Sequence, residues 1–447
     1  MEFPTLQQAI LDVAGRLSAS VINPLLAFWS SAELQSYLIE ALQTWNAYTN
    51  FWRGDMVIPL LQNQTWYDIP SQSGSLRPYT MTDFTLLQQI EYHLLEPVST
   101  AYPLVWSGSG QFGAADIIQA IQLRRDELIG ASSCSITPVY VNAPFTNRVP
   151  LPQSVIDVRR VLWMPISGFG FQNSILYEND DFAQESFAVG DTTAPQQPPT
   201  TFQQSAQPPM SFDTDYVPPV PGQYEVLAVT AGNALAMSAS QLLYVPDDWA
   251  WLIKWGSLAT LFGREVNAKD ALRAEYCEKR YQDGVQLLMQ SPAVLAARLN
   301  NVPIYVDSVR NGDDFDVTWQ SIAGPPTTLY TPGLNLIGAG LPDQTNAYSV
   351  TLRVVRNAPL PVLPTDTLQL IPDDYNAVLS EAQHLACLKM GGAEFAASIK
   401  LHENFLLRAA LYNSKLLALG QFPETQLELS QLEQQRNPVY ATEAPQQ

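Results

Sequence analysis

Charge is scarce in this chain, and positive charge is especially scarce. Only 15% of its 447 residues are Asp, Glu, Lys or Arg, and no lysine occurs before Lys254. Proteins that bind DNA tightly neutralise its phosphates with clustered Lys and Arg, so this composition argues against a DNA-binding surface. The net charge of −20 fits either a soluble acidic particle or a channel wall that repels DNA. A chain with so few charges can also hide much of its surface in an oligomer.

Cysteine is rare as well. Cys134, Cys277 and Cys387 are odd in number, widely spaced and form no CxxC pair. This usage indicates reduced thiols in a protein that is made and assembled in a cytoplasm. The first 20 residues place no basic segment before their apolar residues, and no apolar run reaches membrane-spanning length. We therefore expect no signal peptide and no membrane partner.

Motifs that carry catalysis are missing from the sequence. It contains no P-loop, no GxGxxG after a strand, no HExxH and no GxSxG. His384, Cys387 and Cys277 could form part of a metal site, but ordinary helix packing is the favoured interpretation. The acidic run 178–185 is typical of a solvated loop, although the 43 acidic residues leave open an acid pair for glycoside hydrolysis. We expect no enzyme activity, no cofactor and no metal.

The hydrophobic pattern predicts an α+β fold, with a helical body and two β-rich blocks. Ser30 and Glu33 form a capping box ahead of a helix. Further helices are expected at 83–94 and 114–129, with Gly130 ending the second, and a short β-like pair at 56–61 and 65–69. In the first β-rich block, strands are expected at 136–141, 155–164, 224–229, 234–237 and 241–245.

Composition and period divide the chain into six expected segments. They are a mainly helical N-terminal region at 1–134, a β-rich block at 135–245, a helical hairpin at 246–300, a second β-rich block at 301–371, a second helical hairpin at 372–421 and an extended tail at 422–447. Within the first block, residues 192–222 are rich in proline. Because proline cannot donate to a strand ladder, this stretch predicts an extended loop or arm.

One short pattern occurs twice. Each copy follows a β-rich block and opens a helix pair, the first pair breaking near Gly263 and the second at Gly391–Gly392. The two prolines are 126 residues apart, and the helix-start residues are Pro246, Asp247, Asp248 and Trp249, then Pro372, Asp373, Asp374 and Tyr375. Proline suits the first helical turn, Asp interacts favourably with the helix dipole, and the aromatic ring anchors the helix. Cation binding by the paired carboxylates is the less favoured alternative. The pattern predicts an internal duplication of strands followed by a helical hairpin.

The most basic spot in the N-terminal part is Arg124 and Arg125. Two interpretations stand side by side for this pair. The arginines can pair locally with Asp126 and Glu127 on their own helix, or they can contact an acidic neighbouring subunit.

Several scattered stretches together resemble the head-to-tail adaptor or neck (connector) proteins of tailed-phage virions. These stretches are 41–53, 64–70, 116–126, 149–161, 244–249 and 278–288. The resemblance implies a helical body docked beneath the portal ring, β-rich parts facing the tail and an extended terminal arm that contacts neighbours. It also implies homo-oligomeric rings of about twelve copies.

The resulting hypothesis is a structural virion protein that forms a ring in the head-to-tail connector. The ring would join capsid to tail and let DNA pass without specific binding. Its expected partners are the portal protein, tail or further neck proteins and other copies of itself; its expected location is the virion neck, after assembly in the host cytoplasm. One alternative is a baseplate or tail protein that docks fibres, and a less favoured one is a cell-wall hydrolase. The Pro-rich stretch and the second unit after residue 300 go beyond a minimal adaptor.

Overall fold

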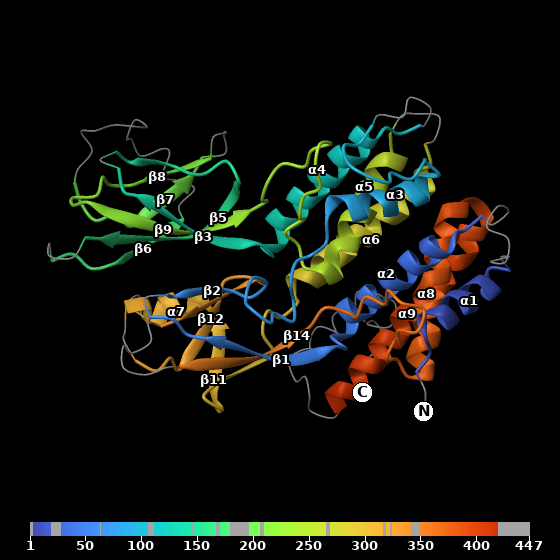
Figure 1. Cartoon of the computed structure of the whole chain (residues 1–447). Helices are drawn as coiled ribbons and strands as arrows, with labels where there is room; N and C mark the ends of the chain where they lie inside the picture. The colour runs from blue at the N-terminus through green and yellow to red at the C-terminus, as the bar shows by residue number, and fades with distance from the viewer. Residues whose placement is uncertain are drawn as a thin grey trace, which may run out of the picture. The chain divides into compact units, whose positions relative to one another are not determined.

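Helices and strands both contribute substantially to this chain (Figure 1). The computed structural model describes residues 3–18, 28–62, 64–105, 111–144, 146–166, 170–178, 196–205, 210–264, 269–315, 319–321, 324–340 and 348–418. These residues form nine α-helices and two seven-stranded sheets, so the expected α+β class is confirmed. The chain divides into a terminal unit of Met1–Phe51, Tyr92–Leu95 and Ala358–Gln447, and a central unit of Trp52–Glu91 and Glu96–Asn357.

The terminal unit is helical. Its helices are α1 (Leu6–Arg16), α2 (Ser31–Thr49), α8 (Pro372–Met390) and α9 (Gly392–Ala418). The expected capping box begins α2: the Ser30 and Glu33 side chains each accept from the other residue's backbone N–H. Trp45 of α2 packs edge-on against Phe405 of α9, with ring centroids 5.7 Å apart. Helices from the two ends of the chain, α2 and α9, therefore share one core.

Four further helices belong to the central unit, except that the last turn of α3 belongs to the terminal unit. They are α3 (Asp83–Leu94), α4 (Ala114–Ser132), α5 (Ala250–Phe262) and α6 (Ala271–Met289). One 3₁₀ turn, Asp247–Trp249, leads into α5. A Cβ atom added at Gly284 of α6 would overlap the Leu252 side chain, so glycine lets α6 approach α5 closely.

The first sheet, called here the flanking sheet, takes strands from two distant parts of the chain. In spatial order they are β1 (Arg53–Pro59), β14 (Ser349–Val355), β10 (Ala296–Leu299), β11 (Val302–Ser308), β12 (Thr328–Thr331), β13 (Leu336–Ala339) and β2 (Trp66–Asp68). Neighbours are antiparallel, except that β11 and β12 are parallel. Helix α7 (Val309–Phe315) follows β11, and a 3₁₀ turn, Trp319–Ser321, comes next.

The second sheet, called here the inserted sheet, is built from one continuous part of the chain. In spatial order its strands are β3 (Ile136–Asn142), β9 (Gly222–Thr230), β5 (Val155–Pro165), β6 (Ser174–Glu178), β7 (Thr201–Gln204), β8 (Ser211–Thr214) and β4 (Arg148–Pro150). Neighbours are antiparallel, except that β6 and β7 are parallel. Alternate residues of these strands, among them Val161, Trp163, Tyr224 and Val226, bury one face in a hydrophobic core.

The two sheets have the same strand order. When each sheet's strands are counted along the chain, both sheets read 1-7-3-4-5-6-2, and in both the parallel pair joins strands 4 and 5. All seven strands of the inserted sheet lie, in sequence, between β2 and β10 of the flanking sheet. In each case two helices precede the first strand and a helical hairpin follows the last one.

Local details around the two sheets also correspond. Thr5, just before α1, forms an isolated antiparallel bridge with Thr367, and Thr82, just before α3, forms one with Leu242. Helices α2 and α4 both end at a left-handed cap residue, Asn50 in one and Ser133 in the other. The correspondence therefore includes the connections between helices and sheets.

Several strand expectations are confirmed and others are wrong. The strands expected at 136–141, 155–164 and 224–229 are β3, β5 and β9. The β-like pair at 56–61 and 65–69 forms strands, but these do not pair with each other: β1 pairs with β14, and β2 with β13. The two runs follow each other closely in sequence, whereas strands far along the chain supply the actual partners.

Three local expectations need correction. The runs at 234–237 and 241–245 form only isolated bridges, through Ala236 and Leu242. Helix α4 continues beyond Gly130 to Ser132. The Pro-rich stretch contains β7 and β8, because its prolines flank two proline-free tetrapeptides that can pair with each other. The other parts of that stretch at 192–195 and 206–209, and the tail expected at 422–447, lie outside the described residues.

Candidate functional site

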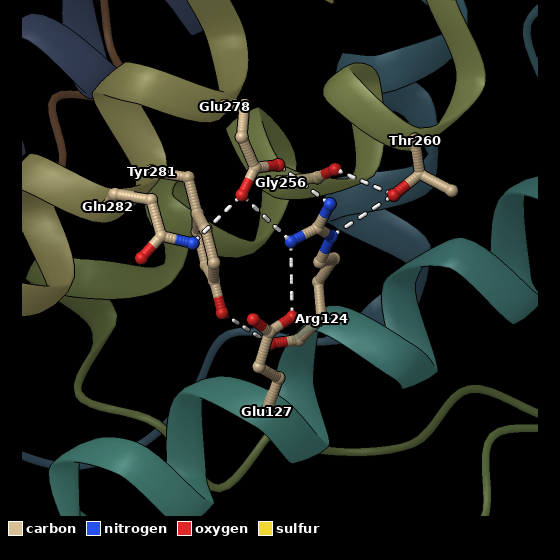
Figure 2. A network of polar contacts seen from close by, with 7 residues as sticks. All are labelled: Arg124, Glu127, Gly256, Thr260, Glu278, Tyr281 and Gln282. Carbon is tan, nitrogen blue, oxygen red and sulfur yellow. Dashed lines mark hydrogen bonds and ion pairs between the residues drawn. The ribbon is translucent and has the colours of Figure 1, made fainter. Parts of the chain in front are cut away.

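Arg124 on α4 holds three helices of the central unit together (Figure 2). Its guanidinium donates to both carboxylate oxygens of Glu278 on α6, at 3.3 and 2.7 Å, and to Glu127 on α4 at 3.1 Å. It also donates to Thr260 Oγ1 on α5 at 3.0 Å and lies 5.1 Å from the centroid of the Tyr281 ring. A planar guanidinium with five donors suits this bidentate and stacked arrangement, which lysine could not reproduce.

Arg125 is buried more deeply than its neighbour. Only 1% of its side chain is exposed; it donates to the Asn233 carbonyl and to the Asp126 carboxylate, each at 2.9 Å. Local pairing with acidic residues, one of the two expected interpretations, is therefore present for both arginines. Contact with a neighbouring subunit stays a prediction, and it would have to use guanidinium groups that already have partners inside the chain.

Asp247, in the first helix-start pattern, joins separate segments of the central unit. Its carboxylate accepts from Thr80 N at 2.7 Å, from Thr80 Oγ1 at 2.5 Å, from Met81 N at 2.9 Å and from Asn357 Nδ2 at 3.2 Å. Burial raises the pKa of Asp247, although the hydrogen bonds from Thr80 and Met81 act in the opposite direction. The sequence assigned this residue to its own helix dipole, but its main hydrogen-bond partners lie just before α3 and just after β14.

The second helix-start pattern makes different contacts in the terminal unit. Pro372 occupies the first turn of α8, as expected. Arg408 of α9 donates to the buried Asp374 at 2.9 Å and lies 3.4 Å from Asp373. Burial raises the pKa of Asp374, and Arg408 opposes that shift. Both patterns therefore tie a helix start to neighbouring elements, through different partners in each case.

A buried polar cluster that the sequence did not indicate is centred on Arg160 of β5. Its Nε and Nη2 atoms donate to the Asp313 carboxylate at 2.5 and 2.9 Å, and its Nη1 atom donates to Glu225 at 3.0 Å. Trp319 Nε1 donates to Asp313 and Gln320 Nε2 to Glu225, both at 2.9 Å. The cluster joins the inserted sheet to α7 and the following turn. The one sequence signal was a charged residue directly before the apolar run 161–164 of β5.

Histidine side chains form a second polar group in the hairpin of α8 and α9, where His384 is buried and His402 is partly buried. His384 Nδ1 lies 2.9 Å from Ser398 Oγ, and His402 Nδ1 lies 2.8 Å from Glu381 Oε2. The two imidazole rings stack with centroids 5.4 Å apart. All three cysteines are buried free thiols. Across the described ranges, no group of three or more His, Cys, Asp and Glu side chains is arranged to hold a metal ion.

A shallow groove of about 660 Å³ runs along α4. Its apolar lining comes mainly from Ile118, Leu123, Leu235 and Met237, and its charged lining from Asp126 and Arg264. Arg264 already pairs with Asp116 at 2.7 Å. This lining suits an apolar side chain.

Comparison with known proteins gives no family for this chain. No protein-family model matches it, and no curated protein matches it. Within the part of the chain that the structure describes, no helix has both the length and the apolar character needed to cross a membrane. Of the acidic run at 178–185, only Glu178 falls within the described residues.

Proposed function

We propose that this chain is a structural subunit of the tailed-phage neck that forms a ring in the head-to-tail connector beneath the portal protein. The observation that carries the proposal is the same strand order in two sheets, each flanked by helices in the same way. The charged groups at the centre of this architecture tie elements together, as Arg124, Arg160 and Asp247 do. Such an arrangement favours a rigid structural protein over an enzyme.

The architecture also supports an internal duplication, in a different order from the tandem one that the 126-residue spacing suggested. In this proposal one copy, from α3 to α6, is inserted between the second and third strands of the other copy. The corresponding loop of the inserted sheet, between β4 and β5, holds only four residues, 151–154. Short surface loops with neighbouring ends are where domain insertions are tolerated. The Pro-rich stretch remains part of this inserted copy.

Exposed apolar side chains support assembly into an oligomer. Val105, Tyr305 and Val362 are 81%, 80% and 71% exposed, in a chain with only 15% charged residues. Single exposed apolar residues are ordinary, so these three support assembly only together with the low charge of the chain. As ring partners we propose the portal protein, tail or further neck proteins and other copies of this chain. The net charge of −20 would let DNA pass without adhering.

Mass photometry and negative-stain imaging of the purified chain, alone and mixed with the portal protein, test this function. The expected result is a ring, or an assembly that depends on the portal. An unrelated acidic protein of similar mass, mixed with the same portal, serves as the control. A chain that stays monomeric, never joins the portal and is immunolabelled at the tail tip of virions would overturn the proposal in favour of a baseplate role.

A further inference from the structure

The two helical hairpins end in equivalent helices. Helix α6 is the second helix of the hairpin that follows the inserted sheet, and α9 is the second helix of the hairpin that follows the flanking sheet. Each helix buries one face, and the buried residues have the same spacing in both: Cys277, Gly284 and Leu288 in α6, and Ser398, Phe405 and Ala409 in α9. The opposite faces of α6 and α9 are therefore equivalent surfaces.

Each of these opposite faces is a narrow stripe whose positions recur at alternating steps of three and four residues. This is the spacing with which one helix packs along another. The α9 stripe consists of Ala397, Lys400, Asn404, Leu407 and Leu411, and all five are exposed. The α6 stripe consists of Leu272, Tyr276, Lys279, Asp283 and Gln286, and all are exposed except Tyr276, which is partly buried. Both stripes are accessible to another molecule.

The apolar parts of the two stripes match when the helices run antiparallel. Leu411 then lies opposite Leu272, and Leu407 lies opposite Tyr276. Leu272, Leu407 and Leu411 are 56%, 56% and 49% exposed. An antiparallel contact would remove this apolar surface from water at one end of each stripe.

Charge favours the same antiparallel register. Lys400 lies opposite Asp283, and Glu403, an exposed neighbour of Asn404, lies beside Lys279. A parallel register that matches equivalent positions would instead place Lys279 opposite Lys400. Because like charges repel, the two stripes are complementary only in the antiparallel register.

The other exposed acidic residue of α6 also fits this register. Glu275 lies at the level of Arg408 of α9, whose side chain is 21% exposed. Arg408 donates to Asp374 through Nε, and a guanidinium with five donors can serve a further carboxylate. Both exposed acidic residues of α6, Glu275 and Asp283, therefore meet a basic residue of α9.

We propose that the α9 stripe of one copy of this chain packs antiparallel on the α6 stripe of a second copy. The inference rests on the ring-forming function proposed above. The two stripes differ, so the contact is head-to-tail, and a head-to-tail contact that closes on itself produces a ring. Each copy would use α9 toward one neighbour and α6 toward the other.

Charge-swap variants test the contact by sedimentation velocity and mass photometry. The α9 swap is Lys400→Glu with Glu403→Lys, and the α6 swap is Lys279→Glu with Asp283→Lys; neither changes the net charge of −20. Each swap alone should weaken self-association at least about tenfold, because like charges then face each other between copies. A chain that carries both swaps should assemble like the wild type, because opposite charges face each other again.

The matched control reverses an exposed ion pair away from both stripes. Asp55→Arg with Arg353→Asp does this on the flanking sheet, where the two side chains are about 60% exposed, and it should assemble like the wild type. Circular dichroism should show that every variant folds, because all the substituted side chains are exposed.

The α9 swap separates this contact from pairing of α9 with α9 of a second copy. In that symmetric contact Lys400 would face Glu403, so the α9 swap alone would preserve opposite charges and leave assembly unchanged. An α9 swap that assembles like the wild type therefore overturns the proposed contact while the ring function stands. A chain with both swaps that does not recover also overturns it, because α9 or α6 then binds a different partner.

The proposed function fails in a distinguishable way. If the wild type assembles only with the portal protein, the same variants are compared in that mixture, and recovery by the chain with both swaps still identifies the contact between neighbouring copies. If the wild type neither self-associates nor joins the portal, both proposals fail.

Discussion

Removing the Asp313 carboxylate is expected to lower the free energy of unfolding by about 3 kcal/mol. The carboxylate accepts two hydrogen bonds from Arg160, at 2.5 and 2.9 Å, and a third from Trp319 at 2.9 Å. The Arg160 and Asp313 side chains are only 6% and 9% exposed. Deleting one partner of a buried pair costs about 3–5 kcal/mol, because the other charge stays buried. Glu225 still accepts from Arg160, at 3.0 Å, which places Asp313→Ala at the lower end of that range.

Urea unfolding followed by tryptophan fluorescence measures this loss, because Trp319 belongs to the cluster. The control is Asp55→Ala: its partner Arg353 lies 3.9 Å away, both side chains are about 60% exposed, and the expected loss is below about 1 kcal/mol. Replacing both charges, as Arg160→Met with Asp313→Leu, should recover most of the stability, because no buried charge then lacks a partner. An Asp313→Ala variant that unfolds at the same urea concentration as Asp55→Ala would refute the reasoning.

Three further predictions follow from the contacts. Arg124→Met should lower the free energy of unfolding by about 1–2 kcal/mol, because Arg124 is 14% exposed but its partner Glu278 is 38% exposed; thermal melts of this variant and Lys279→Met would measure it, and equal melts would contradict it. Because burial raises the pKa of Asp247, the wild type should gain stability as the pH falls through that raised value, and Asp247→Asn should lose this gain. Urea unfolding midpoints measured across acidic pH would show the difference. Midpoint-against-pH curves that run parallel for the wild type and the variant would contradict it. A fragment of residues 79–291 keeps the whole inserted sheet with α3 to α6, and it should unfold cooperatively by itself. A fragment of residues 136–345 lacks β1, β2 and β14 of the flanking sheet, and it should not unfold cooperatively.

Features encoded within a few residues were predictable from the sequence. Ser30 and Glu33 begin α2 as expected, and Pro372 begins α8, because helix starts select side chains by local hydrogen bonding and backbone geometry. The apolar alternation of β3, β5 and β9 was equally local. These signals need only one turn of helix or one strand, so a single sequence is sufficient to reveal them.

Strand partners and the Arg160 cluster could not be found in the same way. Arg53 of β1 pairs with Val355 of β14, far along the chain, and no sequence feature of either strand identifies the other as its partner. Arg160 and Asp313 are 153 residues apart, in a strand and a helix with no common pattern. The same reason explains why only the helix starts revealed a repeat: the two sheets share a strand order, which depends on pairings between residues that are distant in sequence.

The place of the insertion follows from the strand order. In each sheet the first two strands along the chain are the two edge strands, and strands three to seven form the continuous middle. An insertion after the second strand therefore separates the two edge strands in sequence from the five central strands. In the flanking sheet those central strands, β10 to β14, stay contiguous in sequence. Those five strands lie within residues 296–355 and can pair with one another before β1 and β2 join at the two edges, which keeps most contacts close in sequence. An insertion within the last five strands would instead split the middle of the sheet and place a whole folded unit between adjacent partners. The loop after the second strand thus disturbs folding least, and the inserted copy of the proposed duplication occupies that loop.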